Sequence, residues 1–206
     1  MPGARATSSA GGRRPRHDPR ESEREILDAA ERFLRERPWR DLTVQRIMER
    51  TDLARPAFYV HFKDRHDLAL RVVDRIRDEL LVEANRWFEG GESDELRAAL
   101  DGVTAVYVEH WPVLRALSAA SGSDATVEAA YHELIQGFVD ATERHIREEQ
   151  AAGRAPGLDP QETARALVWM VDTYLREALG TPGPVEPARA VEALNGIWSA
   201  TLYGRV

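Results

Sequence analysis

Five side chains suited to binding a polyanion lie within one short stretch of the chain, from Arg55 to Arg65. The other three are Tyr59, His61 and Lys63. An arginine can donate two parallel hydrogen bonds to a guanine, whereas lysine, tyrosine and histidine can donate to phosphate oxygens. The stretch contains no obvious catalytic partner for them. These residue types therefore favour recognition of nucleic acid over catalysis.

The rest of the chain lacks the motifs of an enzyme or a metal site. It has no cysteine, which excludes thiolate catalysis and cysteine-based zinc sites. Neither a nucleophile elbow nor a glycine-rich phosphate loop is present. The histidines show no metal-binding spacing such as HExxH, and they are His17, His61, His66, His110, His132 and His145. We therefore expect no enzyme activity, no cofactor and no metal.

Charge is distributed unevenly along the chain. The formal net charge is −7, yet residues 1–67 hold 15 Lys and Arg against 12 Asp and Glu. The remaining residues hold 13 against 23. A basic N-terminal part on an acidic body indicates that only this part meets a polyanion, although chance clustering of solvated charge gives the same count.

The composition also predicts where the chain resides. It contains neither an apolar run near the roughly 20 residues that span a bilayer nor the apolar core of a signal peptide. We expect no membrane contact and a cytoplasmic location, which the missing cysteines also fit. Residues 1–20 are rich in Gly, Ser, Pro and Arg, with little to bury, which predicts a disordered basic arm.

An amphipathic helix and two short helices must position the basic stretch. The helix over 21–37 carries apolar residues at i, i+3, i+4, i+7 and i+8 from Ile26. Helices over 43–50 and 54–60 then flank a three-residue turn, which is the helix-turn-helix spacing. The second of these can enter the major groove of DNA with its first residues at the base edges.

In that geometry the side chains of the second helix separate into two sets. Leu53 and Phe58 face inward, while Arg55 can reach a guanine and Ala57 a thymine methyl. Lys63 and the residues around it begin the next helix, where free amides and the helix dipole favour a phosphate. The residues predicted to contact DNA are Thr43, Arg55, Pro56, Ala57, Tyr59, His61, Lys63 and Arg65.

Beyond the basic stretch the sequence predicts longer helices and no strand. The expected fold is all-α, with about nine helices and no internal repeat. Pro112 should kink or break a helix that begins near Ser93. The helices expected in this part cover about 65–89, 93–110, 112–120, 125–151, 160–179 and a last segment that ends near 203.

The segment "LTVQRIMERTDLARPAFYVHFKDRHDLAL" resembles the N-terminal signature of the TetR family of transcriptional repressors. The resemblance covers about 26–70. It implies a DNA-binding domain over 21–67 and a ligand-binding and dimerisation domain over 68–206. Members of this family bind operators, commonly inverted repeats, as dimers, and they release them when a small molecule enters the larger domain.

Two positions depart from the usual pattern of this family. The turn commonly has Gly where Asp52 stands; Asp can adopt the left-handed conformation at some cost. Ala54 replaces the usual Ser or Thr cap and forfeits about 0.5–2 kcal/mol of capping. We expect the recognition helix to order fully only on DNA.

A closer resemblance, to the ethionamide-resistance repressor group within this family, is carried by "ARPAFYVHF", "LVWMVDTYL" and "GIWSATLYG". It implies a long apolar tunnel for a small apolar ligand. Asparagines stand in that group where this chain has Val168 and Val171, so a more apolar ligand is expected, with Asp172 as a polar handle or a solvated residue. The residues expected to line the tunnel are Val103, Tyr107, Trp111, Phe138, Trp169, Met170, Val171, Asp172, Thr173 and Trp198.

The resemblance also implies a homodimer through the last two helices. Their apolar residues at helical spacing serve either the dimer or the core, and they are Leu167, Leu175, Leu179, Val191, Leu194, Ile197 and Leu202. A helical protein-interaction module and a ligand-binding protein without DNA binding stay as alternatives. Neither alternative would need the basic stretch.

Overall fold

A computed structural model describes residues 18–90, 93–155, 157–180 and 185–204, and these residues form helices without any strand. The expected all-α fold is confirmed. Its elements are α1 (Pro19–Glu36), the 3-10 turn η1 (Trp39–Asp41), α2 (Val44–Met48), the 3-10 turn η2 (Arg55–Ala57), α3 (Phe58–His61), α4 (Arg65–Gly90), α5 (Ser93–Ser121), α6 (Ala125–Ala151), α7 (Pro160–Gly180) and α8 (Pro187–Tyr203).

The described part of the chain has eight α-helices, close to the expected nine, because one expected division does not occur. Pro112 lies inside the continuous helix α5. An interior proline costs about 3 kcal/mol. The neighbouring Val113, Leu114 and Leu117 are almost fully buried, and burial stabilises by about 1.5–3 kcal/mol for each such side chain. Packing of the turn that follows Pro112 therefore keeps the helix intact.

The predicted arm and the first helix meet earlier than expected. Most of the arm, residues 1–17, lies outside the described residues. α1 begins at Pro19, where the Asp18 carboxylate accepts a hydrogen bond from the Arg20 amide at 2.9 Å. The apolar stripe that starts at Ile26 is buried as predicted.

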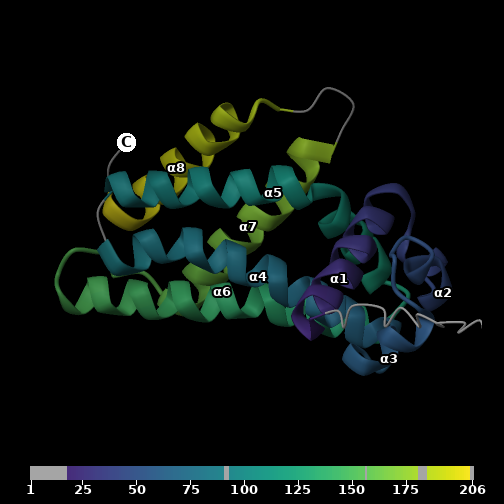
Figure 1. Cartoon of the computed structure of the whole chain (residues 1–206). Coiled ribbons are helices and arrows are strands. Elements are labelled where there is room, and N and C mark those ends of the chain that lie inside the picture. The colour runs from purple at the N-terminus through teal and green to yellow at the C-terminus, as the bar shows by residue number, and fades with distance from the viewer. Residues whose placement is uncertain (1–17, 91–92, 156, 181–184, 205–206) are drawn as a thin grey trace, which may run out of the picture.

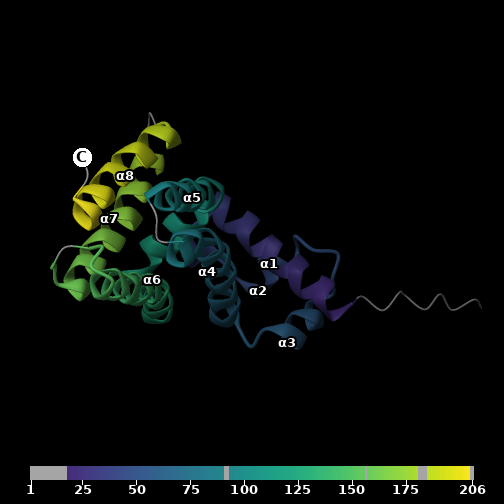
Figure 2. The same ribbon diagram turned by 90° about the vertical axis from the view of Figure 1, so that its left-hand side faces the viewer.

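Helices α1 to α3 occupy one end of the molecule, and α4 leads from them into the body (Figure 1). α5 and α6 pack against α4, and α7 and α8 complete the body on the side away from α1 to α3 (Figure 2). α1 packs against both α4 and α5. One apolar core joins the two parts, and in the described residues no helix has both the length and the hydropathy to cross a membrane.

Asp124 connects the N-terminal end to the body. Its Oδ2 accepts hydrogen bonds from Trp39 Nε1 at 3.0 Å and His66 Nε2 at 2.9 Å. Its Oδ1 accepts from the amides of Thr126 and Val127 and so caps α6. Burial alone would raise the pKa of Asp124, but the hydrogen bonds from Trp39 and His66 outweigh it and lower the pKa to about 2. One ionised side chain therefore ties η1 and α4 to the start of α6.

Replacing Asp124 should cost more than replacing an ordinary helix cap. Asp159 is the matched control, because it caps α7 through the Glu162 amide at 3.1 Å and bonds to no other element. We expect Asp124→Ala to lower the free energy of unfolding by about 2–3 kcal/mol and Asp159→Ala by about 1 kcal/mol. Urea denaturation followed by circular dichroism measures both. Equal losses would show that the bonds to Trp39 and His66 contribute nothing.

The same carboxylate should make stability depend on acid. Because the folded pKa of Asp124 is below its usual value of 3.8, its charge stabilises the fold above pH 4, and this contribution is lost as the pH falls toward 2. Asp124→Asn should therefore be less stable than the parent at pH 7 by about 1 kcal/mol, with the difference vanishing near pH 2. Urea denaturation at pH 7, 4 and 2.5 tests this, and a difference independent of pH would contradict it.

Candidate DNA-binding surface and ligand cavity

The helix-turn-helix is held by apolar side chains that face inward. Phe58 and Phe62 are almost fully buried, and Leu53 is half-buried against the same core. Thr43 Oγ1 accepts from the Arg46 amide at 3.2 Å, so the expected cap of α2 is confirmed. These contacts fix the angle of α3 to α2 and determine which side chains α3 presents to solvent.

Asp52 and Ala54, the two residues that depart from the family pattern, affect how the recognition segment begins. Ala54 supplies no side-chain cap, and the helix begins with the 3-10 turn η2 before α3. No non-glycine residue of the described ranges has a positive φ, so Asp52 does not need the left-handed conformation considered for it. Its amide instead donates to Glu25 Oε1 on α1 at 2.6 Å. α1 therefore stabilises the turn that a glycine would otherwise form.

Three of the predicted DNA-contacting side chains are free. Arg55 and Lys63 are exposed, and Tyr59 is 54% exposed. Within the described ranges no side chain pairs with the Arg55 guanidinium, the Lys63 ammonium or the Tyr59 hydroxyl. Pro56 is also exposed and Ala57 is half-buried beside them. These residues form an outward surface, hereafter the recognition surface, whose cations have no protein partner to displace.

Two other predicted contacts are already occupied by the protein. His61 Nε2 lies 2.7 Å from Ser22 Oγ on α1. The guanidinium of Arg65 lies 5.2 Å from the centre of the Trp39 ring and donates to the Leu42 carbonyl. The structure thus gives both side chains a role in packing, and it does not favour their expected role as phosphate donors.

The expected phosphate site on the free amides of α4 is also occupied. Asp64 Oδ1 accepts from the His66 amide at 2.7 Å and the Asp67 amide at 3.0 Å. Asp67 Oδ2 accepts from the Lys63 amide at 2.9 Å. The Asp67 amide bond is the main reason that the pKa of Asp64 is lowered. Two carboxylates therefore fill these donors and would repel a phosphate, so the expectation is wrong in this detail.

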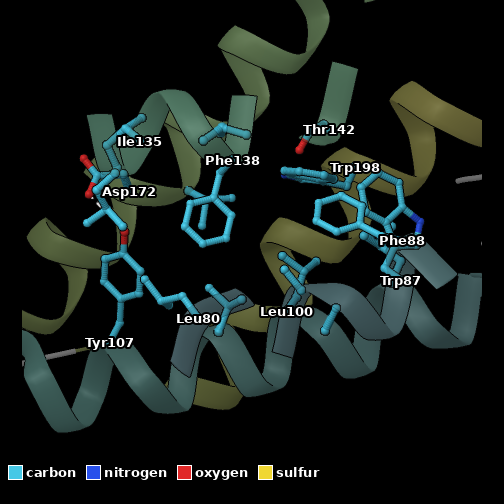
Figure 3. Close-up of a pocket in the computed structure, with 17 residues that line it drawn as sticks. Leu80, Trp87, Phe88, Leu100, Tyr107, Ile135, Phe138, Thr142, Asp172 and Trp198 are labelled. Carbon is cyan, nitrogen blue, oxygen red and sulfur yellow. Dashed lines mark hydrogen bonds between the residues drawn. The ribbon is translucent and has the colours of Figure 1, made fainter. Parts of the chain in front are cut away.

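The body contains an apolar cavity between α4, α5, α6, α7 and α8 (Figure 3). Its volume is about 80 Å³, well below the roughly 300–1,000 Å³ of typical ligand sites. A drug-sized ligand must therefore move side chains of the wall. Leu80, Ala84, Trp87 and Phe88 of α4 belong to that wall.

Six of the ten residues expected in the tunnel line this cavity, and they are Val103, Tyr107, Phe138, Val171, Asp172 and Trp198. Val168, where the resembling group has asparagine, also lines it. Trp111 instead donates from Nε1 to the Arg176 carbonyl at 3.0 Å, outside the wall. Trp169, Met170 and Thr173 are not on the wall either, because successive residues of α7 turn by about 100° and Val168, Val171 and Asp172 form its inner face. The four α4 residues were missed, although their i, i+4, i+7 and i+8 spacing indicates one helix face.

One end of the cavity is closed by a buried charge with several partners. Asp172 accepts hydrogen bonds from the hydroxyls of Tyr107 at 3.0 Å and Tyr131 at 2.5 Å. Arg176 donates to both of its carboxylate oxygens and also to Ser118 Oγ. Burial, and then the charge of Asp172, raises the pKa of both tyrosines, which stay neutral. Asp172 is thus a neutralised part of the wall and not a free polar handle.

The opposite end is built from aromatic rings. Trp87 and Trp198 meet edge to face with ring centres 5.5 Å apart, and Trp87 Nε1 donates to the Tyr203 hydroxyl at 2.8 Å. Trp198 Nε1 is buried without a partner in the described part of the chain. Figure 3 shows Trp198 beside Thr142 at this end, far from the Tyr107 and Asp172 end. The cavity is therefore apolar between one neutralised polar end and one aromatic end.

Curated relatives with similar sequences are mycobacterial regulators. The chain is 28% identical over 197 residues to the HTH-type transcriptional regulator EthR of Mycobacterium tuberculosis, covering 93% of this chain and 90% of the relative. It is 27% identical over 196 residues to the EthR of Mycolicibacterium smegmatis, covering 93% and 89%.

Solved structures share the fold. A regulator of the same family from Rhodococcus sp. superposes with a TM-score of 0.75 at 24% identity, covering 88% of this chain and 99% of the other. The SmeT–triclosan complex gives a TM-score of 0.75 at 22% identity, covering 89% and 92%.

Two family models match: bacterial regulatory proteins of the tetR family over residues 26–72, and the C-terminal domain of the transcriptional regulator EthR over residues 96–204. The chain therefore belongs to the TetR family of transcriptional regulators, with a C-terminal domain of the EthR type.

Proposed function

We propose that this regulator is a repressor that leaves its operator when a small, uncharged, apolar ligand enters the cavity. The observation that carries the proposal is the course of α4. This unbroken helix begins beside the recognition surface at Arg65, and its later turns form the cavity wall through Leu80, Ala84, Trp87 and Phe88. A ligand that moves one end of such a helix changes the position of the other.

The exposed residues of the recognition surface that lack a protein partner support the following DNA contacts. Arg55 reads a base, for which a bidentate contact to guanine is the commonest choice. Lys63 and Tyr59 contact phosphates, which fix register without reading sequence. Thr43 lies exposed at the start of α2 and Pro56 and Ala57 at the start of the recognition segment, where they approach the same groove.

A homodimer through α7 and α8 would present two recognition surfaces to successive major grooves, about 34–36 Å apart, and so read an inverted repeat. Most of the apolar residues expected at this interface are buried inside the chain, namely Leu167, Leu175, Val191, Leu194 and Leu202. Ile197 is 47% exposed and Leu179 is half-buried. The half-buried Trp169 and Met170 on the outer side of α7 add to the surface that a partner would cover.

The cavity wall favours a ligand without net charge. Arg176 already neutralises Asp172, so an ionic ligand would find no free counter-charge in the cavity and would lose its hydration. The valines at 168 and 171 add only apolar surface to the wall. The SmeT structure was determined with triclosan, and SmeT is described as the repressor of an efflux pump of Stenotrophomonas maltophilia. A small aromatic molecule of this kind suits the aromatic end of the cavity.

Release follows from the small volume of the cavity. A ligand larger than about 80 Å³ must displace wall side chains such as Leu80 and Phe88, and it binds only a form in which α4 has shifted. Such a ligand favours that form by its difference in affinity for the two forms. The same coupling requires DNA to weaken ligand binding by the same factor.

Replacing Arg55 and replacing Lys63 should weaken DNA binding in different ways. With duplexes enriched from a random pool by the parent chain, we expect Arg55→Ala to cost about 1–3 kcal/mol on the preferred sequence and to relax its choice of base. Lys63→Ala should weaken all duplexes alike and reduce the slope of log affinity against log salt by about 1. Fluorescence anisotropy of labelled duplexes measures both effects.

Arg165→Ala is the matched control for this comparison, since Arg165 is an exposed arginine on α7, far from the recognition surface, and among the described residues it pairs with Glu162 alone. It should bind DNA as the parent does. If Arg55→Ala kept the affinity and the sequence choice of the parent, base reading by this residue would be excluded. If the parent chain bound no duplex even at low salt, the proposed repressor function would be excluded.

Filling the cavity should prevent ligand binding. We expect Val103→Trp to reduce binding of the uncharged fluorophore N-phenyl-1-naphthylamine at least about tenfold, because the indole occupies the space between α4 and α5. In the parent the fluorophore should also lower the affinity for the operator. Fluorescence titration and DNA anisotropy give the two readings.

Val108→Trp supplies the control, because Val108 lies on the same helix but is 47% exposed. It should bind the fluorophore as the parent does. Equal binding by Val103→Trp and Val108→Trp would place the fluorophore outside the cavity. Binding in the cavity without any effect on DNA would contradict release by the ligand while leaving DNA recognition intact.

A further inference from the structure

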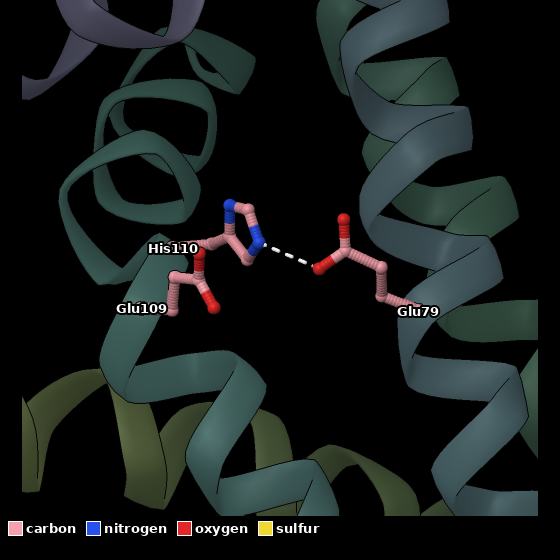
Figure 4. Close-up of side chains that lie close together, drawn as sticks. All are labelled: Glu79, Glu109 and His110. Atoms are coloured by element: carbon pink, nitrogen blue, oxygen red, sulfur yellow. Dashed lines mark hydrogen bonds and ion pairs between the residues drawn. The ribbon is translucent and has the colours of Figure 1, made fainter.

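A second cluster of polar side chains lies between α4 and α5, apart from both the recognition surface and the cavity. It consists of Glu79 on α4 and of Glu109 and His110 on α5. Each offers one ligand atom, and these three atoms lie within 4.8 Å of one another. Figure 4 shows Glu79 facing His110 across the gap between the two helices. Ligand atoms at this spacing can converge on one cation after small side-chain movements.

The three side chains differ in burial in a way that suits a metal site. His110 is only 2% exposed, and its Nε2 lies 2.8 Å from Glu79 Oε2. The Glu79 side chain is 38% exposed, and Glu109 is exposed. The imidazole is therefore held rigidly, while both carboxylates lie at the surface, where they are free to adjust and where an ion can enter.

A second carboxylate approaches the other nitrogen of the same histidine. Glu31 of α1 is 5% exposed, and its Oε2 lies 3.6 Å from His110 Nδ1. Neither this nitrogen nor Glu31 Oε1 has a hydrogen-bond partner in the described part of the chain, although Arg75 lies 3.4 Å from Glu31 Oε1 as an ion pair. The imidazole therefore has a carboxylate beside each ring nitrogen, Glu31 at Nδ1 and Glu79 at Nε2, and the carboxylate at Nε2 is the one that reaches the surface.

The charge around the cluster is negative. Asp28, Glu31, Glu79 and Glu109 face it from three helices, and the cations that approach them are Arg75 and Arg35. Four carboxylates against two arginines leave a net negative charge here, which favours the approach of a cation.

We propose that His110 Nε2, Glu79 and Glu109 bind one divalent transition-metal ion of the zinc class between α4 and α5. Zinc accepts imidazole nitrogen and carboxylate oxygen together, at about 2.0–2.2 Å, whereas magnesium and calcium prefer oxygen alone. The ion replaces the direct contact between His110 and Glu79, and water completes its coordination. Glu31 Oε2, now 3.6 Å from His110 Nδ1, would accept from Nδ1–H after a small side-chain movement and, as an outer-shell carboxylate, fix the tautomer and ring orientation of the ligand.

The position of the site predicts that the ion stabilises the folded chain. It links α4 to α5 and, through Glu31, to α1, the three helices that join the recognition surface to the body. An ion that binds only the folded chain raises its melting temperature with ion concentration. The sequence could not indicate the site, because Glu79 and His110 are 31 residues apart and no short motif includes both.

The test uses the full chain after treatment with a chelator. We expect ZnCl2 to bind with one ion per chain by isothermal titration calorimetry, and CoCl2 to give visible absorption bands that zinc abolishes. Glu109→Gln, a change at an exposed side chain that leaves the fold intact, should lower zinc affinity more than about tenfold. Glu128→Gln, at an exposed glutamate of α6, should leave it unchanged.

Two histidine variants, one at a buried and one at an exposed position, complete the test. His110→Asn should abolish the cobalt absorption bands and the rise in melting temperature with zinc, whereas His132→Asn, at an exposed histidine of α6, should preserve both. Zinc binding that is equal in the parent, Glu109→Gln and Glu128→Gln would mean an adventitious ion only and would overturn the proposal. Absence of binding at millimolar zinc would overturn it as well. DNA binding in zinc-free buffer is independent of either result.

Discussion

The structure depends on the continuity of one helix. α4 has 26 residues and is therefore about 39 Å long, so it reaches from the recognition surface to the aromatic end of the cavity. A helix is stiff along its axis, so a rigid shift of one end moves the other end as well. The two functions of the family are thus joined in one element, and the boundary expected at residue 67 divides a helix that is continuous in space.

Electrostatics decides which cations are available to DNA. Within the basic stretch, Arg65 and His61 pair with Trp39 and Ser22 and hold the small helices together. Arg55 and Lys63 have no protein partner in the described ranges, so their charge is directed to solvent. Asp124 makes this separation possible, because its carboxylate, ionised at neutral pH, accepts from η1, α4 and the start of α6 at once. The orientation of the recognition surface relative to the body therefore depends on one partly buried charge.

The cavity and the proposed metal site show two ways in which a helical body handles buried polarity. At the end of the cavity, Asp172 is satisfied by two tyrosine hydroxyls and Arg176, which leaves an uncharged interior suited to an apolar ligand. At the cluster around His110 the acidic groups outnumber the arginines that approach them, and the resulting negative charge favours a cation. Both sites adjoin α4, the helix that begins beside the recognition surface.

The sequence by itself determined the helical class, the helix-turn-helix, the inward Phe58, the outward Arg55 and the family, because helix periodicity, caps and turn spacing are local properties of the chain. Tertiary structure decided that α5 continues through Pro112, because burial of the residues that follow the proline outweighs its missing hydrogen bond. It also decided that His61 and Arg65 face the protein and that only one face of α7 lines the cavity. The Asp124 connection and the cluster at His110 join residues distant in the chain. Their contacts exist only after the helices pack, so no local pattern could reveal them.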